Sequence, residues 1–231
     1  MVRHALRLLA ILPLLTILLL HMALHQYPLY YAQPHAVTYI AEAVVPLLAY
    51  ALLLFIAAAY IRPSLEPHLR FALALGLALG VMEFIAVCIE SGVPFGVQGP
   101  WLQITFILTL FTGWGAAAFH ARRHFATLPQ ALAASLCAAV VSMALAIPAA
   151  SLFELFLHPP NPAYVTLWGE YQRAHWTDPR AFALANTMDS ITSHLLAAPL
   201  VATVVGLFGY FAAGLLPPGQ RPSQDPLLTR K

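Results

Sequence analysis

The sequence predicts an all-α membrane protein, a bundle of six transmembrane helices with both termini in the cytoplasm. Charged residues make up only 9% of the 231 residues, whereas soluble domains carry about a quarter. Hydrophobic residues make up 61% and the mean hydropathy is +0.77. The ranges 8–41, 91–121, 124–153 and 190–220 contain no Asp, Glu, Lys or Arg. Runs of this length and composition are typical of membrane spans.

The boundaries of the six spans follow from the residues between the apolar runs. A basic start and an uninterrupted apolar core without a clean cleavage site favour a first span over a cleaved secretory signal. Proline, glycine and charged residues then separate the later runs near positions 26–28, 62–64, 91–94, 122–123 and 158–162. The spans are therefore expected at 5–24, 37–61, 70–91, 101–120, 131–156 and 184–216. Each can cross about 30 Å of hydrocarbon as a helix, which satisfies its own backbone polar groups.

The distribution of basic residues predicts the orientation of the bundle. Nine lie on the side that carries both termini: Arg3, Arg7, Arg62, Arg70, Arg122, Arg123, Arg221, Arg230 and Lys231. Only Arg173 and Arg180 lie on the other side, and the positive-inside rule places the richer side in the cytoplasm. We expect one domain over 1–220, an outer loop at 157–183 and a cytoplasmic tail at 221–231. Ten Arg against one Lys indicates a bacterial inner membrane, and a net charge of +2 excludes a nucleic-acid footprint.

Five carboxylates lie within the spans or at their ends, and this topology places all of them in the outer half. They are Glu42, Glu83, Glu90, Glu154 and Asp189. A charge at the centre of a bilayer costs about 2.5–3.5 kcal/mol on insertion scales, so a buried acid usually has a function. We favour a functional role for Glu83 and Asp189. The other three are better explained as residues that face water or headgroups.

The sixth span carries a polar stripe near its outer end. Asn186, Asp189, Ser190, Ser193 and His194 follow one another at helical spacing. Asp178 and Pro179 are typical of an N-cap and the first helical position, so the helix begins there. Before it, residues 163–174 have aromatic and apolar residues at helical spacing, which predicts a helix on the outer surface.

The region around this stripe resembles the emopamil-binding (EXPERA) family of sterol isomerases. The resemblance covers the Leu-Trp-Gly-Glu-Tyr stretch at 167–171, Asp-Pro-Arg at 178–180, Met-Asp-Ser-Ile-Thr at 188–192 and Pro199. It implies that Glu154 and Asp189 handle protons and that Trp168 lies near the site.

These residues lead to a first functional hypothesis, an intramembrane enzyme that performs acid–base chemistry on a lipid or isoprenoid. Desolvation favours the neutral form of a carboxylic acid, which can then protonate a double bond. The expected catalytic residues are Asp189, Glu83, Glu154 and His194. The expected substrate-binding residues are Asn186, Ser190, Ser193, Trp168, Glu42 and Glu90. No cofactor and no metal is expected, and the oligomeric state is left open.

Three alternatives remain. The same acids would serve a proton- or cation-coupled transporter, although the inner half of the predicted spans contains no acid. Asp189, His194, His158 and a glutamate have the ligand types of a zinc or iron site. An accessory subunit of a membrane complex would also have short loops. No P-loop, G-x-S-x-G or C-x-x-C motif supports ATP-driven, serine-hydrolase or thiol-redox chemistry.

Overall fold

The computed structural model describes residues 1–92 and 100–216, and this part of the chain is helical without a strand. Six of its helices are long and apolar enough to cross a membrane. They cover Val2–Gln26, Ala36–Tyr60, Glu66–Ile89, Gln103–Arg123, Leu128–Leu157 and Pro179–Leu215. The prediction of a six-helix membrane bundle is therefore confirmed, and each predicted span overlaps one of these helices.

The helices and their bounds are α1 (Val2–Leu9), α2 (Ile11–Gln26), the 3-10 helix η1 (Pro28–Ala32), α3 (Ala36–Tyr60), α4 (Glu66–Gly92), α5 (Pro100–Arg123), α6 (Leu128–Leu152), the π-helix η2 (Phe153–Leu157), α7 (Pro162–Val165), α8 (Gly169–Ala174) and α9 (Pro179–Leu215). The predicted surface helix at 163–174 is two short helices, because the chain leaves helical geometry at Trp168, the N-cap of α8. Asp178 caps α9 and Pro179 is its first residue, as predicted.

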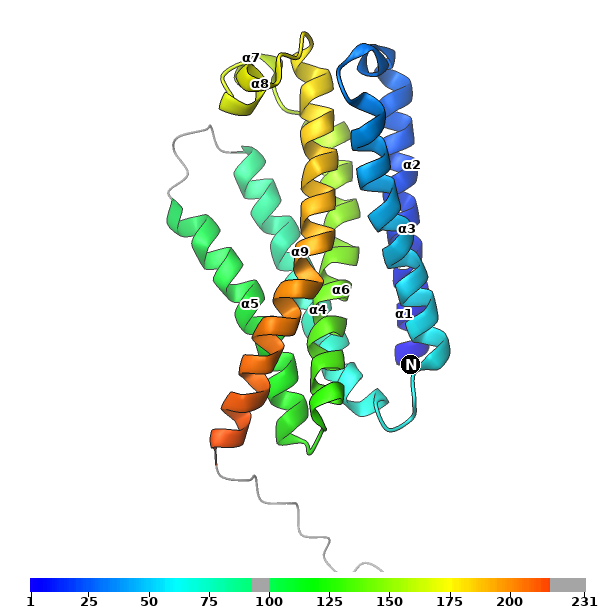
Figure 1. The fold of residues 1–231 in the computed structure, drawn as a ribbon, viewed down its shortest axis with the longest axis vertical. Helices are drawn as coiled ribbons and strands as arrows, with labels where there is room; N and C mark the ends of the chain where they lie inside the picture. The colour runs from blue at the N-terminus through cyan, green and yellow to red at the C-terminus, as the bar shows by residue number, and fades with distance from the viewer. Residues whose placement is uncertain (93–99, 217–231) are drawn as a thin grey trace, which may run out of the picture.

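Helix α6 is the centre of the bundle. It packs against α2, α4, α5 and α9, and α3 covers α9 and α1 from the other side. The described chain begins and ends at one end of the bundle, here called the terminus end, while α7 and α8 lie at the other end (Figure 1). Towards this α7/α8 end, α4 and α5 lean away from α9 (Figure 1).

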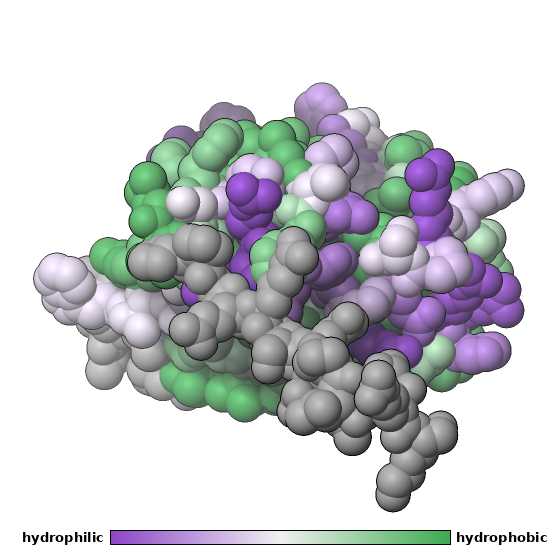
Figure 2. Space-filling model, turned by 90° about the horizontal axis from the view of Figure 1, so that it is seen from below, coloured by the Kyte–Doolittle hydropathy of each residue, from purple (hydrophilic) through white to green (hydrophobic). Residues whose placement is uncertain are grey.

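The basic residues of the described chain divide between the two ends as the sequence predicts. Arg3, the link after α3 and the end of α5 lie at the terminus end, and Arg173 and Arg180 lie at the α7/α8 end (Figure 1). Seen from the terminus end, hydrophilic residues gather on the end face and hydrophobic residues lie along its margin (Figure 2). Which end faces the cytoplasm stays a prediction.

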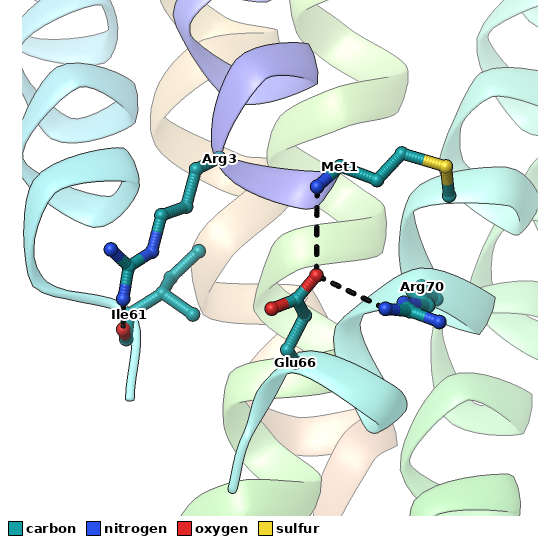
Figure 3. A network of polar contacts seen from close by, with 5 residues as sticks. All are labelled: Met1, Arg3, Ile61, Glu66 and Arg70. Atoms are coloured by element: carbon teal, nitrogen blue, oxygen red, sulfur yellow. Dashed lines mark hydrogen bonds and ion pairs between the residues drawn. The ribbon is translucent and has the colours of Figure 1, made fainter. Parts of the chain in front are cut away.

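A small polar network joins three helices at the terminus end (Figure 3). The Glu66 carboxylate lies 3.7 Å from the Met1 amino group and 3.3 Å from the Arg70 guanidinium. Arg3 donates a hydrogen bond of 2.7 Å to the backbone carbonyl of Ile61. These contacts connect the start of α1 to the end of α3 and the start of α4.

An aromatic cluster holds the loop that contains α7 and α8 against the opposite end. The Trp176 ring lies 5.9 Å from Tyr30, 5.9 Å from Tyr39 and 5.6 Å from Phe182. The Tyr30 hydroxyl donates to the carbonyl of Ala36, and burial raises the pKa of this phenol. The cluster therefore fixes the start of α9 relative to η1 and α3.

Glycines permit close helix contacts in the terminus half of α5 and α9. A Cβ atom on Gly209 would overlap the carbonyl oxygen of Gly115, and one on Gly206 would lie 2.9 Å from the Ser135 side chain. In α4, a Cβ on Gly76 would lie 2.6 Å from the Ala138 carbonyl oxygen of α6. Small residues have this role in membranes because lipid supplies no hydrophobic force between helices.

We predict that Gly209→Ala lowers the melting temperature of the protein in detergent. The added methyl group meets backbone of α5, which has no rotamer to change, and overpacking of this kind costs about 1–3 kcal/mol. Gly214→Ala is the matched control, because a Cβ atom there meets nothing within 4 Å. Equal melting temperatures for the two variants would show that α5 and α9 are not in backbone contact.

Candidate functional site

The largest of the described cavities lies between α4, α5, α6 and α9, towards the α7/α8 end. It measures about 390 Å³ and is lined mainly by apolar side chains, among them Phe106, Leu110, Met143 and Val201. Glu83 of α4 and His194 of α9 also line this apolar cavity. Ligand pockets typically have this size and this combination of apolar walls with a few polar groups.

The carboxyl group of Glu83 is the buried acid of the apolar cavity. Its Oε2 atom is buried and has no hydrogen-bond partner among the residues that the structure describes. It lies close enough to His194 for the two side chains to interact electrostatically. A buried polar atom without a partner is costly, which makes this carboxyl oxygen a candidate contact for a ligand.

The His194 ring has one nitrogen held and one nitrogen left for the cavity. Its Nδ1 atom lies 2.7 Å from the backbone carbonyl oxygen of Ser190 and 3.3 Å from the Ser190 hydroxyl. A carbonyl oxygen only accepts, so Nδ1 carries the proton of that bond. Proton uptake and release therefore fall to Nε2.

A second, narrower cavity continues from the first towards the α7/α8 end, and we call it the junction cavity. It measures about 60 Å³, and Glu83 and His194 line it as well. Its polar lining also includes Ser151, Glu154, Thr187 and Ser190. The Thr187 hydroxyl lies 3.5 Å from a Glu154 carboxyl oxygen and donates to the Ala183 carbonyl at 3.2 Å.

Glu154 reaches this position from the π-helical turn η2, which replaces the last turn of α6. The amide of His158 donates to the carbonyl of Phe153 at 2.7 Å, a bond that spans five residues. The wider turn includes Glu154, which is half-buried. Single π-helical turns within α-helices occur frequently at functional sites.

The polar stripe of α9 divides between two directions. Ser190 and His194 line the junction cavity. All five residues of the stripe are exposed, but Asn186, Asp189 and Ser193 line neither cavity. Asp189 and His194 are five residues apart, which turns their side chains about 140° from one another around the axis. The structure thus brings Glu83, Glu154 and His194 together and leaves Asp189 outside this group.

Of the remaining predicted site residues, Glu42 and Trp168 line none of the three cavities. Glu42 is exposed on α3. Trp168 is half-buried at the start of α8, with its ring 6.4 Å from Phe182. Glu90 belongs to α4, but its side chain lies outside the described residues.

Trp114 lines the apolar cavity and Thr187 lines the junction cavity, although neither is among the predicted site residues. Thr187 precedes His194 by seven residues and so shares its face of α9, a spacing that was available in the sequence. Trp114 lies 3% exposed at the apolar cavity, where its indole N–H donates to the Ser142 hydroxyl at 3.3 Å. No signal in α5 itself distinguishes this Trp from a packing residue.

The proposed metal ligands do not come together. Within the described residues, no group of three or more His, Cys, Asp or Glu side chains is arranged to hold a metal ion. Glu83 and His194 supply two such groups, and the rest of the cavity wall is apolar except for Gln103.

Comparisons with known proteins do not assign the chain to a family. No protein-family model, curated protein or solved structure matches it. The resemblance to the emopamil-binding family stays a prediction, and the site is interpreted from its own geometry.

We predict that Glu83→Gln and His194→Gln have non-additive effects on the free energy of unfolding. Two side chains that interact across one cavity are expected to couple by about 0.5–3 kcal/mol. A double-mutant cycle in detergent, followed by circular dichroism, measures this coupling. The cycle of Glu83→Gln with Asp189→Asn is the control, and we expect additivity within about 0.5 kcal/mol. Coupling of Glu83 to Asp189 instead would contradict the placement of these side chains.

Proposed function

We propose that the protein is an intramembrane enzyme that moves protons on a lipid substrate, with Glu83 and His194 as its acid–base pair. The observation that carries the proposal is that a carboxyl and an imidazole line one apolar cavity of ligand size. General acid–base catalysis uses side chains of these types, held within reach of the atoms that gain or lose a proton. The apolar wall selects a hydrocarbon portion of a lipid or isoprenoid.

The chemistry that fits this pair is the shift of a carbon–carbon double bond. One group delivers a proton to one carbon of the double bond, and the other removes a proton from a neighbouring carbon. A C–H bond forms and a C–H bond breaks, so the substrate is isomerised without an oxidant or a cofactor. On His194 the proton enters or leaves at Nε2, because Nδ1 is held by Ser190. Glu154 lies beyond the pair, where it exchanges protons with the α7/α8 end.

The same geometry gives less support to a transporter. In the terminus half of the bundle, Gly115 and Gly209 bring α5 and α9 into backbone contact. Trp114, which precedes Gly115, lines the apolar cavity, and its indole N–H donates to the Ser142 hydroxyl of α6. An ion route through the bundle would have to open this packing.

The chain is a multi-pass membrane protein, and we propose the bacterial inner membrane with the terminus end in the cytoplasm. The basic residues of the terminus end support this orientation. The site then opens towards the outer leaflet, where its lipid substrate would be recruited.

We predict that the wild-type protein catalyses deuterium incorporation into a lipid. The protein would be reconstituted in vesicles made from a bacterial total lipid extract and incubated in D₂O, and the lipids analysed by mass spectrometry. Proton transfer to carbon replaces hydrogen by deuterium at the reacting positions. Glu83→Gln and His194→Gln are each expected to lower the rate at least about 100-fold, the contribution of a general acid or base.

Glu42→Gln and Asp189→Asn are the controls for this experiment, because both carboxylates are exposed away from the cavity. Both variants should retain the wild-type rate. The proposal is wrong if the wild type incorporates no deuterium above empty vesicles, or if Glu83→Gln retains full activity. Loss of activity in Asp189→Asn alone would return the role of principal acid to Asp189.

A further inference from the structure

A third cavity lies above the junction cavity at the α7/α8 end, and we call it the surface cavity. It measures about 270 Å³ and lies between the end of α2, η2, the link before α7 and the first turns of α9. Its polar lining includes Gln26, Tyr27, Asn161 and Arg180. Glu154 and Thr187 form its floor and also line the junction cavity.

One face of α9 lines all three cavities. Arg180, Ala183 and Thr187 line the surface cavity, and His194 and Val201 continue the same face below. Arg180 and His194 are 14 residues apart, so about 21 Å of helix separates them. The three cavities therefore follow one another along α9, with the smallest in the middle and the most apolar one farthest from the α7/α8 end.

Arg180 is the only arginine or lysine among the lining residues of the three cavities. Its Nη1 atom donates to the Tyr27 hydroxyl at 2.7 Å, and its guanidinium carbon lies 6.0 Å from the centre of the Tyr27 ring. These contacts hold the guanidinium at the cavity and leave its other N–H groups for a ligand.

No carboxylate of the described chain forms an ion pair with Arg180. The nearby Asp178 carboxylate accepts from the backbone amides of Arg180 and Ala181, at 2.8 and 3.2 Å, as the cap of α9. The Asn161 side-chain oxygen accepts from the amide of Ala163, which leaves its NH₂ group as a second donor at the cavity. Donors around a single cation are the environment that an anionic oxygen requires.

We propose that the surface cavity binds the phosphate head group of a single-chain amphiphile whose hydrocarbon chain runs along α9 into the apolar cavity. This inference rests on the proposed function and names its substrate class. Glu154 is adjacent to Thr187, about 10 Å along α9 below Arg180, and its carboxyl group stops an anionic head group from descending. The narrow junction cavity requires a linear chain, and on the order of 15 carbon atoms would span the distance from Arg180 to His194.

Binding of hexadecyl phosphate to the full-length protein in phosphatidylcholine nanodiscs tests this proposal. Native mass spectrometry would compare it with hexadecanol, which lacks the charge, and with inorganic phosphate, which lacks the chain. We expect hexadecyl phosphate to bind at least about tenfold more tightly than hexadecanol, since a charge-assisted hydrogen bond contributes about 1.5–3 kcal/mol. Arg180→Gln should remove this difference, and Arg180→Lys should restore part of it.

Arg173→Gln is the matched control, because Arg173 is an exposed arginine of α8 that pairs with Glu170 at 3.6 Å. It should leave the preference for hexadecyl phosphate unchanged. With the wild type alone, hexadecylamine should not displace hexadecyl phosphate, which tests the charge preference without any variant. Equal binding of the phosphate and the alcohol, or an unchanged preference in Arg180→Gln, would overturn the proposal. Inorganic phosphate that competes as strongly as hexadecyl phosphate would also overturn it, because the site would then be one for free phosphate.

Glu83→Gln separates this inference from the proposed function. The variant should keep the preference for hexadecyl phosphate over hexadecanol, because Glu83 lines the apolar and junction cavities and not the surface cavity that would hold the head group. If the wild type prefers hexadecyl phosphate but catalyses no deuterium exchange, the proposed enzymatic function is wrong and the proposed head-group site stands. If the wild type catalyses deuterium exchange but shows no head-group preference, only the proposed head-group site is wrong.

Discussion

Small residues let the helices of the terminus half approach one another closely, and the positions of the other helices follow from these contacts. In lipid, apolar surface gains nothing by leaving its surroundings, so helices associate where small residues let their backbones meet. In α5 and α9 the first glycines are Gly113 and Gly206, and both lie in the terminus half. The preceding turns of both helices carry larger side chains. Helices α5 and α9 are therefore in close contact in the terminus half, and α5 leans away from α9 towards the α7/α8 end (Figure 1).

The separation of α4 and α5 from α9 leaves cavities in the half of the bundle that contains Glu83 and Glu154. The apolar and junction cavities occupy the half in which α4 and α5 lean away from α9 (Figure 1). Glu83, Glu154 and His194 come from three different helices and meet only because α6 holds those helices in one arrangement. The aromatic cluster around Trp176 fixes the start of α9 and with it the height of Arg180 and Thr187. The positions of the cavity-lining polar residues therefore depend on helix contacts in other parts of the bundle.

The sequence predicts the helices well because long charge-free runs have no other stable structure in a bilayer. It predicts the acid residues of the site for the same reason, since each costs free energy unless it is used. It does not predict which acids meet. Sequence spacing shows how Asp189 and His194 are arranged around one helix. Which face of that helix points into the bundle depends on the neighbouring helices, and spacing along one helix does not predict it. The sequence of α4 predicts Glu83 as a site residue. That His194 is its partner follows only from the packing of α4 against α6 and α9. The break at Trp168 and the π-helical turn at Glu154 likewise follow from tertiary contacts.

The exposed position of Asp189 has a consequence for the membrane in which the protein can reside. At the terminus end, the Arg122 guanidinium lies 4.7 Å from the centre of the Tyr210 ring, a cation–aromatic pair typical of the lipid boundary. Asp189 stands 21 residues before Tyr210 on the same helix, about 32 Å away along the axis. That length matches a hydrocarbon core of about 30 Å. A thicker bilayer would draw the carboxylate into the acyl chains unless α9 became more upright, so hydrophobic matching restricts the protein to membranes of ordinary or lesser thickness.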